Sequence, residues 1–361
     1  MPETFCIIMA GGSGERFWPR SRKNTPKQFL NLFGKISLFE QTLLRLQGFV
    51  SEQKILIISN RQYVETIRAL CPAIPEENII GEPRNRDTAP CIALAAGIVK
   101  KKAKTPNPVM IFLPSDHWIL NREAMLSDFS LCLKAAEKSN ALITIGVVPT
   151  EPSPNYGYIE CGRKEGEAPL FHVTRFLEKP SEEVAQELLA KGNYRWNSGI
   201  FIFPLKGLCL ELQKQAPELF ELSEQIAESW ETSRFNDVLE KSFGSIRKIS
   251  IDYAIMEHAS NIMVLEASFK WDDVGNWPAL KKHCALDENH NVENDSSCLL
   301  DCKDCIVFSD DSTQLLAGID LKGLMLIKTR DVLLVAPTES ASRIKDLLAL
   351  LSSRKEFQKY L

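Results

Sequence analysis

The sequence predicts an α/β protein with a mixed, mostly parallel sheet and a small β-rich C-terminal domain. Over residues 5–148, short apolar runs alternate with segments of helical periodicity, which is typical of βαβ units with right-handed crossovers. From about residue 286, short strand-like runs follow one another and end in a closing helix. We therefore expect one large domain over residues 1–285 and a small β-rich domain over residues 286–361.

The strands of the first half are predicted from buried apolar runs. They are expected at 5–10, 55–59, 109–116 and 142–148. The clearest helix between them begins at Ser37, because Ser37 and Glu40 form a capping-box pattern ahead of apolar residues at helical spacing up to Val50. Ligands of such sheets bind beyond the carboxyl ends of the strands, so the loops that follow the strands are the places to search for a site.

The pattern changes after residue 150 and again after residue 286. Strand-like pieces of the middle part are YGYIE (156–160), FHVTRFLEK (171–179), NSGIFIF (197–203) and NIMVLEASFKWDDVG (261–275). Those of the last part are CIVFS (305–309), GLMLIKT (323–329) and DVLLVA (331–336). Ile344, Leu347, Leu348 and Leu351 follow at i, i+3, i+4 and i+7, which predicts the closing helix. The polar stretch 287–297 is the expected linker.

Composition excludes several classes of protein. The 361 residues are 44% hydrophobic and 25% charged with a net charge of −4, which gives no global electrostatic basis for binding nucleic acid. The run 5–10 is too short for a signal sequence or a membrane span. Ten cysteines at irregular spacing, with no secretory leader, indicate a cytoplasmic protein with reduced thiols.

One group of cysteines could bind zinc. Cys302 and Cys305 have C-x-x-C spacing, with Cys298 and His290 nearby. No second C-x-x-C pair is present, and the segment has the pattern of a strand in which cysteine is a small apolar residue. Packing is therefore favoured over zinc binding.

The loop after the first strand, GGSGERFWPRSRKNTPKQF (11–29), combines glycines with basic residues. It is not a Walker A loop, because the Gly34–Lys35 pair is followed by Ile36. It is not a dinucleotide fingerprint either, because Phe17 occupies the place of the third glycine. The backbone N–H groups of such a loop can still hold phosphates while its basic side chains neutralise their charge. The alternative is a glycine turn with solvated basic residues.

Two aspartates stand where a metal ion could bind. Asp116 ends the apolar strand VMIFLPSD (109–116), and Asp273 lies in WDDVGNW (271–277) after another strand. Magnesium prefers one or two protein carboxylates, with substrate phosphates and water completing its shell. The alternative is that each aspartate caps a backbone N–H. His117, beside Asp116, is expected to be a hydrogen-bonded wall residue and not a ligand.

Together these segments resemble the nucleotide-sugar pyrophosphorylases, and most closely the mannose-1-phosphate guanylyltransferases. The glycine loop, GEPRNRDTAPCIALAA (81–96), FLPSDH, NYGYIE, FLEKP, NSGIF, SIDYAIMEH and WDDVGNW occur in the family's order, over roughly residues 3–285. The resemblance implies a Rossmann-like, GT-A-like nucleotidyltransferase domain, with a nucleotide half over about 1–150 and a sugar-phosphate half over about 151–285. It also implies a left-handed β-helix-like C-terminal domain.

The resemblance implies that GTP and mannose 1-phosphate react to GDP-mannose and pyrophosphate with Mg²⁺. The attacking phosphate oxygen is already ionised at neutral pH, so in-line attack on the α-phosphorus needs no general base, only positioning and charge neutralisation. By the resemblance, the catalytic residues are Arg16 and Lys27, and the metal is bound by Asp116 and Asp273. The resemblance assigns the nucleotide to Gly11, Gly12, Ser13, Gly14, Arg86 and Thr88. It assigns the sugar phosphate to Gly157, Glu178, Lys179 and Asn197.

Departures from the family pattern leave alternatives open. Asp87 stands where the family usually has Asn, so it could weaken base or ribose contacts or pair with Arg84 or Arg86. The chain stops at Leu361, so we expect no fused isomerase domain. The alternatives are a pyrophosphorylase for another sugar 1-phosphate or nucleotide, and a non-catalytic regulatory subunit that binds nucleotide sugar. Family analogy alone implies a homodimer.

Overall fold

The computed structural model describes residues 1–12, 14–293, 296–311 and 313–361. They form two compact units. The first unit consists of Met1–Gly11, Leu44–Ser115 and Ile119–Asp272, and the second of Gly12–Leu43, Asp116–Trp118 and Asp273–Leu361. The glycine loop after Gly11 thus groups with the C-terminal part of the chain. The predicted domain boundary after residue 285 stays a prediction.

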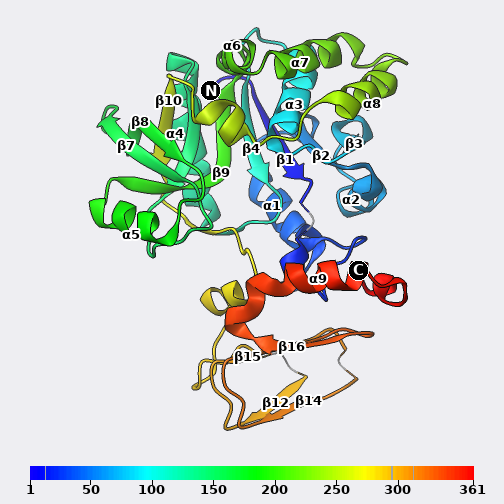
Figure 1. The fold of residues 1–361 in the computed structure, drawn as a ribbon. Helices are drawn as coiled ribbons and strands as arrows, with labels where there is room; N and C mark the ends of the chain where they lie inside the picture. The colour runs from blue at the N-terminus through cyan, green and yellow to red at the C-terminus, as the bar shows by residue number, and fades with distance from the viewer. Residues whose placement is uncertain (13, 294–295, 312) are drawn as a thin grey trace. The chain divides into compact units, whose positions relative to one another are not determined.

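The first unit is built on a nine-stranded sheet with the order β3-β2-β1-β4-β9-β6-β10-β8-β7 (Figure 1). Its strands are β1 (Thr4–Ala10), β2 (Ile55–Asn60), β3 (Ile79–Glu82), β4 (Val109–Pro114), β6 (Leu142–Val147), β7 (Tyr158–Lys164), β8 (Leu170–Leu177), β9 (Tyr194–Pro204) and β10 (Ile262–Glu266). β1 pairs in parallel with β2 and β4, and β2 in parallel with β3. β9 runs antiparallel to β4 and β6. The predicted mixed α/β fold is confirmed.

The helices agree with the expected alternation. Those of the first unit are α2 (Val64–Leu70), α3 (Thr88–Lys102), α4 (Arg122–Ser139), α5 (Glu182–Lys191), α6 (Leu205–Gln215), α7 (Pro217–Ser229) and α8 (Phe235–Ser245). α1 (Leu38–Leu46) begins where predicted: the Ser37 N–H donates to Glu40 Oε2 at 2.8 Å, and the Glu40 N–H donates to Ser37 Oγ at 3.2 Å. It ends at Leu46, before the predicted Val50. No helix in the described ranges is long and apolar enough to cross a membrane.

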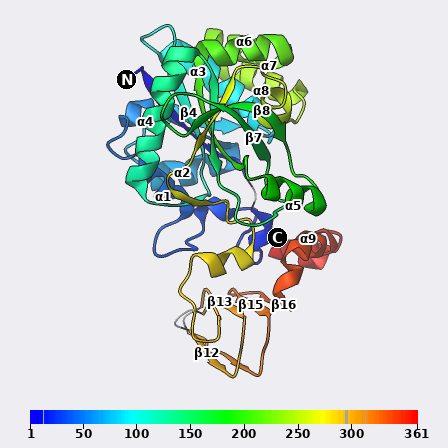
Figure 2. The ribbon, with the colours of Figure 1, turned by 90° about the vertical axis from the view of Figure 1, so that its left-hand side faces the viewer.

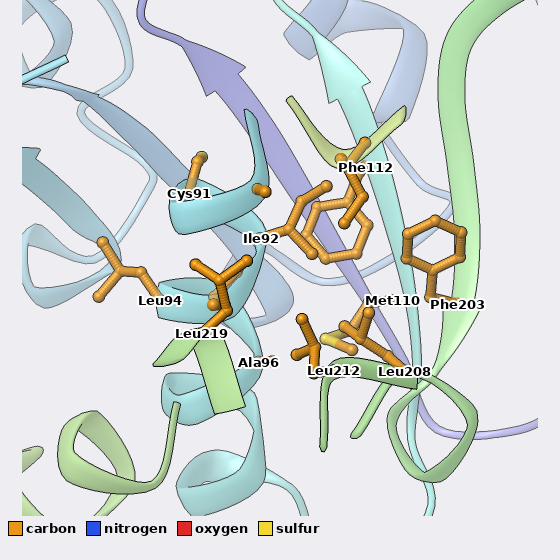
Figure 3. Close-up of a cluster of buried hydrophobic side chains, with 14 of the residues drawn as sticks. Cys91, Ile92, Leu94, Ala96, Met110, Phe112, Phe203, Leu208, Leu212 and Leu219 are labelled. Atoms are coloured by element: carbon orange, nitrogen blue, oxygen red, sulfur yellow. The ribbon is translucent and has the colours of Figure 1, made fainter. Parts of the chain in front are cut away.

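The largest core lies around α3, whose residues from Ala89 to Val99 are all buried. A helix that is apolar on every side has to be enclosed by other elements. Figure 3 shows Ile92 of α3 beside Phe112 of β4, with Leu208 and Leu212 of α6 beside Met110. All five side chains belong to one cluster of buried apolar residues. Side chains of β7, β8 and β9 also belong to this core, which thereby supports the strands in or next to which Gly157, Glu178 and Asn197 lie.

The second unit contains β12 (Ser297–Leu300), β13 (Ile306–Ser309), β14 (Leu316–Ile319), β15 (Leu324–Lys328), β16 (Leu333–Pro337) and α9 (Ile344–Ser352). β13 pairs in parallel with β15, which pairs antiparallel with β16 (Figure 2). The glycine-loop segment is anchored to this part, since Trp18 Nε1 donates to Tyr360 O and Trp277 Nε1 donates to Trp18 O. The predicted β-rich C-terminal region is confirmed.

Two of the three cysteines near the C-x-x-C motif are packed, whereas Cys298 is exposed. Cys302 and Cys305 are buried beside Val307 in a small apolar cluster, as the packing interpretation expects. Within the described ranges no group of three or more His, Cys, Asp or Glu side chains could hold a metal ion. The expected linker 287–297 includes residues 294–295, which lie outside the described residues; in its described part, Asn291 is buried and bonded to Cys302 O.

The contact between α3 and α7 allows a test of packing. A Cβ on Gly97 would overlap Ser223 O and lie 2.8 Å from Ile226 Cβ. We therefore expect Gly97→Ala to lower the free energy of unfolding by about 1–3 kcal/mol, because the helices must separate. Urea denaturation of the full chain measures this. Gly244→Ala is the matched control, because a Cβ there meets no atom within 4 Å; equal midpoints for the two variants would contradict the packing argument.

Candidate active site

Three of the predicted residues meet around one buried ammonium group in the second unit. The side chain of Lys27 is 7% exposed, and its Nζ donates to Asp116 Oδ2 at 2.8 Å and to the backbone O of Asp273 at 2.5 Å. These positions are far apart in the sequence, so the contact is a product of the fold. An ammonium buried with a carboxylate partner is a strong local interaction, because little water screens it.

The glycine loop is shaped by this lysine. Gly14 has φ +59°, and a Cβ there would overlap Lys27 Cβ and lie 2.8 Å from the Lys27 backbone N. Only glycine combines that backbone conformation with such close approach. A Cβ on Gly12 would meet nothing within 4 Å, which leaves the backbone there open to a ligand. Ser13, which the resemblance also assigns to the nucleotide, lies outside the described residues.

Asp116 is held in its charged form. Burial raises the pKa of this carboxyl, but the Lys27 ammonium and, to a smaller extent, His117 lower it. The resulting pKa lies below the usual value for an aspartate. Asp116 is therefore a carboxylate at neutral pH. A charged carboxylate is what a hard divalent cation requires.

Asp273 and Arg16 lie on one side of the same cluster. A Cβ on Gly275 would lie 3.3 Å from Asp273 Oδ2 and 3.8 Å from Arg16 Nη1, so both side chains are near that point. Arg16 Nε is buried and has no hydrogen-bond partner among the described residues. A buried N–H without an acceptor is unusual in folded proteins. The orphan donor of Arg16 is available to an anionic ligand.

The backbone that carries Asp273 is strained. Val274 has φ +48° and is fully buried in the apolar cluster that includes Phe17 and Trp277. A β-branched residue at positive φ is a genuine outlier. This conformation costs about 1–3 kcal/mol of folding free energy and persists only where packing imposes it. The packing of Val274 thus sets the position of the neighbouring carboxylate.

The residues fit a magnesium ion of the kind that substrate phosphates complete. Asp116 and Asp273 supply hard carboxylate oxygens, and Lys27 already balances part of the negative charge of Asp116. With two protein carboxylates, the remaining positions of an octahedral ion are left to phosphate oxygens and water.

The predicted sugar-phosphate residues meet in the first unit. A Cβ on Gly157 would lie 2.5 Å from Glu178 Oε2, and the Asn197 N–H donates to Gly157 O at 2.8 Å. Lys179 Nζ donates to Glu178 Oε1 at 2.6 Å. Glu178 and Lys179 line a pocket of about 630 Å³ that also includes Thr88 and Asp252. The structure brings together all four residues that the resemblance assigned to the sugar phosphate.

Sequence reasoning missed Asp252 in this pocket. Asp252 Oδ1 accepts from Asn197 Nδ2 at 2.9 Å, and the residue opens a π-helical turn over Asp252–Met256. Burial and the charge of Glu178 raise the pKa of its carboxyl to about 7. Single π-turns and shifted carboxyl groups both occur often at functional sites. The available signal was a charged residue within SIDYAIMEH, a segment used for the resemblance but given no role.

Arg86 and Thr88 are engaged with the chain itself. Arg86 Nε donates to Phe243 O at 2.9 Å, and Thr88 Oγ1 accepts from the Ile251 N–H at 2.8 Å. Asp87 between them has φ +72° and caps α3 by accepting from the Thr88 N–H. In the described part of the chain, Arg86 therefore bonds to carbonyl groups and not to Asp87. The nucleotide-binding role of Arg86 and Thr88 stays a prediction.

A mixed-sheet α/β unit, a glycine loop and a carboxylate–lysine cluster are typical of the class of nucleotidyltransferase enzymes. The family model described as Nucleotidyl transferase matches residues 5–290, and a second, described as MannoseP isomerase/GMP-like beta-helix domain, matches residues 295–351. The chain belongs to the nucleotidyl transferase family, within the group of the mannose-1-phosphate guanylyltransferases.

Individual relatives agree with this assignment. The mannose-1-phosphate guanylyltransferase of Klebsiella pneumoniae is 34% identical over 98% of this chain and 75% of its own length. The one from Escherichia coli (strain K12) is 34% identical over 95% of this chain and 72% of its own length. A crystal structure described as mannose-1-phosphate geranyltransferase from Thermus thermophilus has a TM-score of 0.87 at 33% identity and covers 97% of this chain and 99% of that one.

The raised pKa of Asp252 predicts how stability depends on pH. A carboxyl with a folded pKa of about 7 and an ordinary value of 3.8 must be ionised at a cost as pH rises between the two, so its contribution to stability is lost over that window. Asp252→Asn removes the cost and keeps an oxygen for Asn197. Relative to the parent, the variant should gain roughly 2–3 kcal/mol in unfolding free energy between pH 5 and pH 8.

Urea denaturation of both proteins at the two pH values measures this difference. Asp346→Asn serves as the control, because that side chain is 74% exposed and its removal should give the same difference at both pH values. A flat profile for Asp252→Asn would show that the carboxyl titrates normally.

Proposed function

We propose that the protein transfers a guanylyl group from GTP to mannose 1-phosphate, forming GDP-mannose and releasing pyrophosphate. The observation that carries this is the buried Lys27 ammonium, bonded to Asp116 and to the Asp273 backbone beside a glycine loop. That arrangement concentrates cationic groups and charged carboxylates where a polyphosphate and a divalent ion can be bound together. The names of the relatives indicate the substrates.

On the nucleotide side, the chain's own residues neutralise charge. Lys27 and the unpaired Nε–H of Arg16 would donate to phosphate oxygens of GTP. Backbone N–H groups of the glycine loop would add further donors. Magnesium held by Asp116 and Asp273 would supply additional positive charge at the reacting phosphates. The attacking sugar-phosphate oxygen is already anionic, so no side chain has to act as a base.

On the sugar side, the pocket offers both acceptors and donors. The Glu178 carboxylate and Asn197 would bind hydroxyl groups of the sugar, and Asp252, with its pKa of about 7, could donate or accept at neutral pH. Lys179 carries the positive charge that the phosphate needs. Burial opposes that charge, but the neighbouring Glu178 raises the pKa of Lys179 above its usual value. Lys179 therefore stays protonated.

The alternatives make different predictions from the same residues. A pyrophosphorylase for another sugar 1-phosphate or nucleotide would use the same cluster around Lys27 and differ in product. A non-catalytic regulatory subunit has no need for a lysine that holds Asp116 and Asp273 together, and the chain keeps all three residues.

We also propose a cytoplasmic homodimer, on family resemblance. A gel-filtration mass of 40.7 kDa, that of one chain, would contradict the dimer.

Replacement of Lys27 tests the function. Lys27→Met keeps most of the volume and removes the charge, so kcat/KM for GDP-mannose formation from GTP, mannose 1-phosphate and Mg²⁺ should fall by about 10²–10³-fold. Product is measured by chromatography, with ATP, UTP and dTTP as competing nucleotides. Asp116 is then left partly buried without its partner, so thermal unfolding must be recorded as well.

Lys100→Met is the matched control, because Lys100 forms an exposed ion pair with Glu224 and should leave activity unchanged. Product from another nucleotide alone would keep the chemistry and change the substrate. No product from mannose, glucose or galactose 1-phosphate with the parent would favour the regulatory subunit.

A further inference from the structure

Two arginines of the glycine-loop segment 11–29 are bonded to the β-rich C-terminal part of the second unit. Arg20 and Arg22 belong to the basic residues that the sequence pattern offers for neutralising phosphates. The side chain of Arg20 is 9% exposed, and its Nε lies 2.8 Å from Asp310 Oδ1. Its guanidinium group also lies over the ring of Phe308, 4.3 Å from the ring centre. The charge of Arg20 is therefore balanced by the protein itself.

Arg22 makes a larger set of contacts. Its Nη2 donates to Asp331 Oδ1 at 2.8 Å, and its Nη1 donates to Asp331 Oδ2 at 3.4 Å. Nη1 donates in addition to the backbone O of Tyr360 at 2.8 Å, and Nε donates to Pro19 O at 2.6 Å. The same Tyr360 O accepts from Trp18 Nε1 at 2.7 Å. An arginine fork within such a network holds its partners in one geometry, unlike an isolated surface ion pair.

The bonded segment lies between the two proposed catalytic residues, Arg16 and Lys27. Phe17, directly after Arg16, is fully buried in an apolar cluster that it shares with residues of β13 and β15. At the other end, the backbone of Arg22 pairs with that of Thr25, two residues before Lys27. Each proposed catalytic residue is thus within two positions of a residue that these contacts hold in place.

We propose that Arg20 and Arg22 are positioning residues for the nucleotide, acting through the glycine loop and not by contact with the phosphates. Their partners Asp310 and Asp331 would then set the affinity for GTP. This inference rests on the proposed function and adds the β-rich part to the nucleotide site of the second unit. A loop that is ordered before binding loses less conformational entropy when the ligand arrives. When either ion pair is broken, GTP has to order the segment itself.

Charge alone predicts the opposite effect. Asp310 and Asp331 are carboxylates and GTP is a polyanion, so Coulomb's law predicts that loss of either carboxylate strengthens GTP binding. The same direction is expected if Arg22 binds a phosphate directly, because Asp331→Ala would free its guanidinium group for the ligand. Positioning predicts weaker binding in the same variants. The sign of the change therefore separates a residue that orders the loop from one that contacts the nucleotide.

The experiment is calorimetric titration of the full chain with GTP in the presence of Mg²⁺, for the parent, Asp310→Ala and Asp331→Ala. Each variant should bind GTP about 5–20-fold more weakly, which is the cost of ordering the freed segment. Asp346→Ala is the matched control, because Asp346 is another carboxylate of the second unit that pairs with an arginine, Arg343. Both side chains of that pair are largely exposed, so GTP affinity should not change.

Steady-state kinetics separates positioning from a merely structural role. KM for GTP should rise by the same factor in both variants, while kcat at saturating GTP stays within about twofold of the parent. KM for mannose 1-phosphate should not change, since the residues proposed for it lie in the first unit. A merely structural role would instead lower the amount of active protein, and so the apparent kcat, and leave both KM values unchanged.

A double variant tests whether the two partners of one ion pair act together. Arg22→Met combined with Asp331→Ala should bind GTP as weakly as Arg22→Met alone, because both substitutions break the same contact. Additive losses would overturn the proposal. If Arg22→Met does not fold, Asp331→Ala decides alone, since the Asp331 side chain is 47% exposed and its removal leaves no cavity.

Equal or tighter GTP binding in either Asp310→Ala or Asp331→Ala would also overturn the proposal. Binding is measured apart from turnover, so the two proposals can fail separately. GDP-mannose formation by a parent whose variants bind GTP equally well would refute positioning and keep the proposed function. Weaker GTP binding in the variants of a chain that forms no GDP-mannose would do the reverse.

Discussion

The contact on which the candidate active site depends is the buried Lys27 ammonium between Asp116 and the Asp273 backbone. It joins three segments of the second unit that are remote in the sequence. Together with His117, it lowers the pKa of the Asp116 carboxyl by more than burial raises it, so the carboxylate stays charged. Gly14 has to be glycine because Lys27 lies against it. The glycine at position 14 and the charge state of a proposed metal ligand therefore both depend on Lys27.

Three carboxyl groups, each at least partly buried, show how environment alone separates their chemistry. Asp116 has a lysine and stays ionised. Asp252 has an amide donor and a neighbouring negative charge, and its pKa rises to about 7. Glu82 has a thiol donor and, among the described residues, no cation partner, and its pKa rises to about 8. The same functional group is thus a permanent anion, a group that titrates near neutrality or a neutral acid, depending on its surroundings.

Much of the fold could be predicted from the sequence, because the apolar runs 5–10, 55–59 and 142–148 are strong local signals for strands. The capping box at Ser37 is equally local and is confirmed. The predicted end of α1 was wrong, because the apolar spacing was followed past Gly48, which has φ +76° and is a typical helix-stop residue. β3 was not predicted, since it has only four residues, Ile79–Glu82. The grouping of residues 12–43 with the C-terminal part depends on tertiary hydrogen bonds from Trp18 and Trp277, which no periodicity encodes.

The site residues also fall into those that the sequence could predict and those that it could not. Gly157, Glu178, Lys179 and Asn197 could be named because they occur in ordered motifs, and the structure brings them together. Asp252 and Glu82 also lie in motifs, but their chemistry comes from what surrounds them, and burial is not a property of a motif.

Backbone strain occurs at three positions next to these groups. Val274 has φ +48° beside Asp273, Asp87 has φ +72° beside Thr88, and Lys179 has φ +45° beside Glu178. Each conformation disfavours folding by about 1–3 kcal/mol and needs surrounding contacts to impose it. Those contacts are visible for two of them: Val274 is buried in an apolar cluster, and Asp87 caps α3. The strain at Val274 shows that apolar packing, whose free energy is large, imposes the backbone conformation next to Asp273.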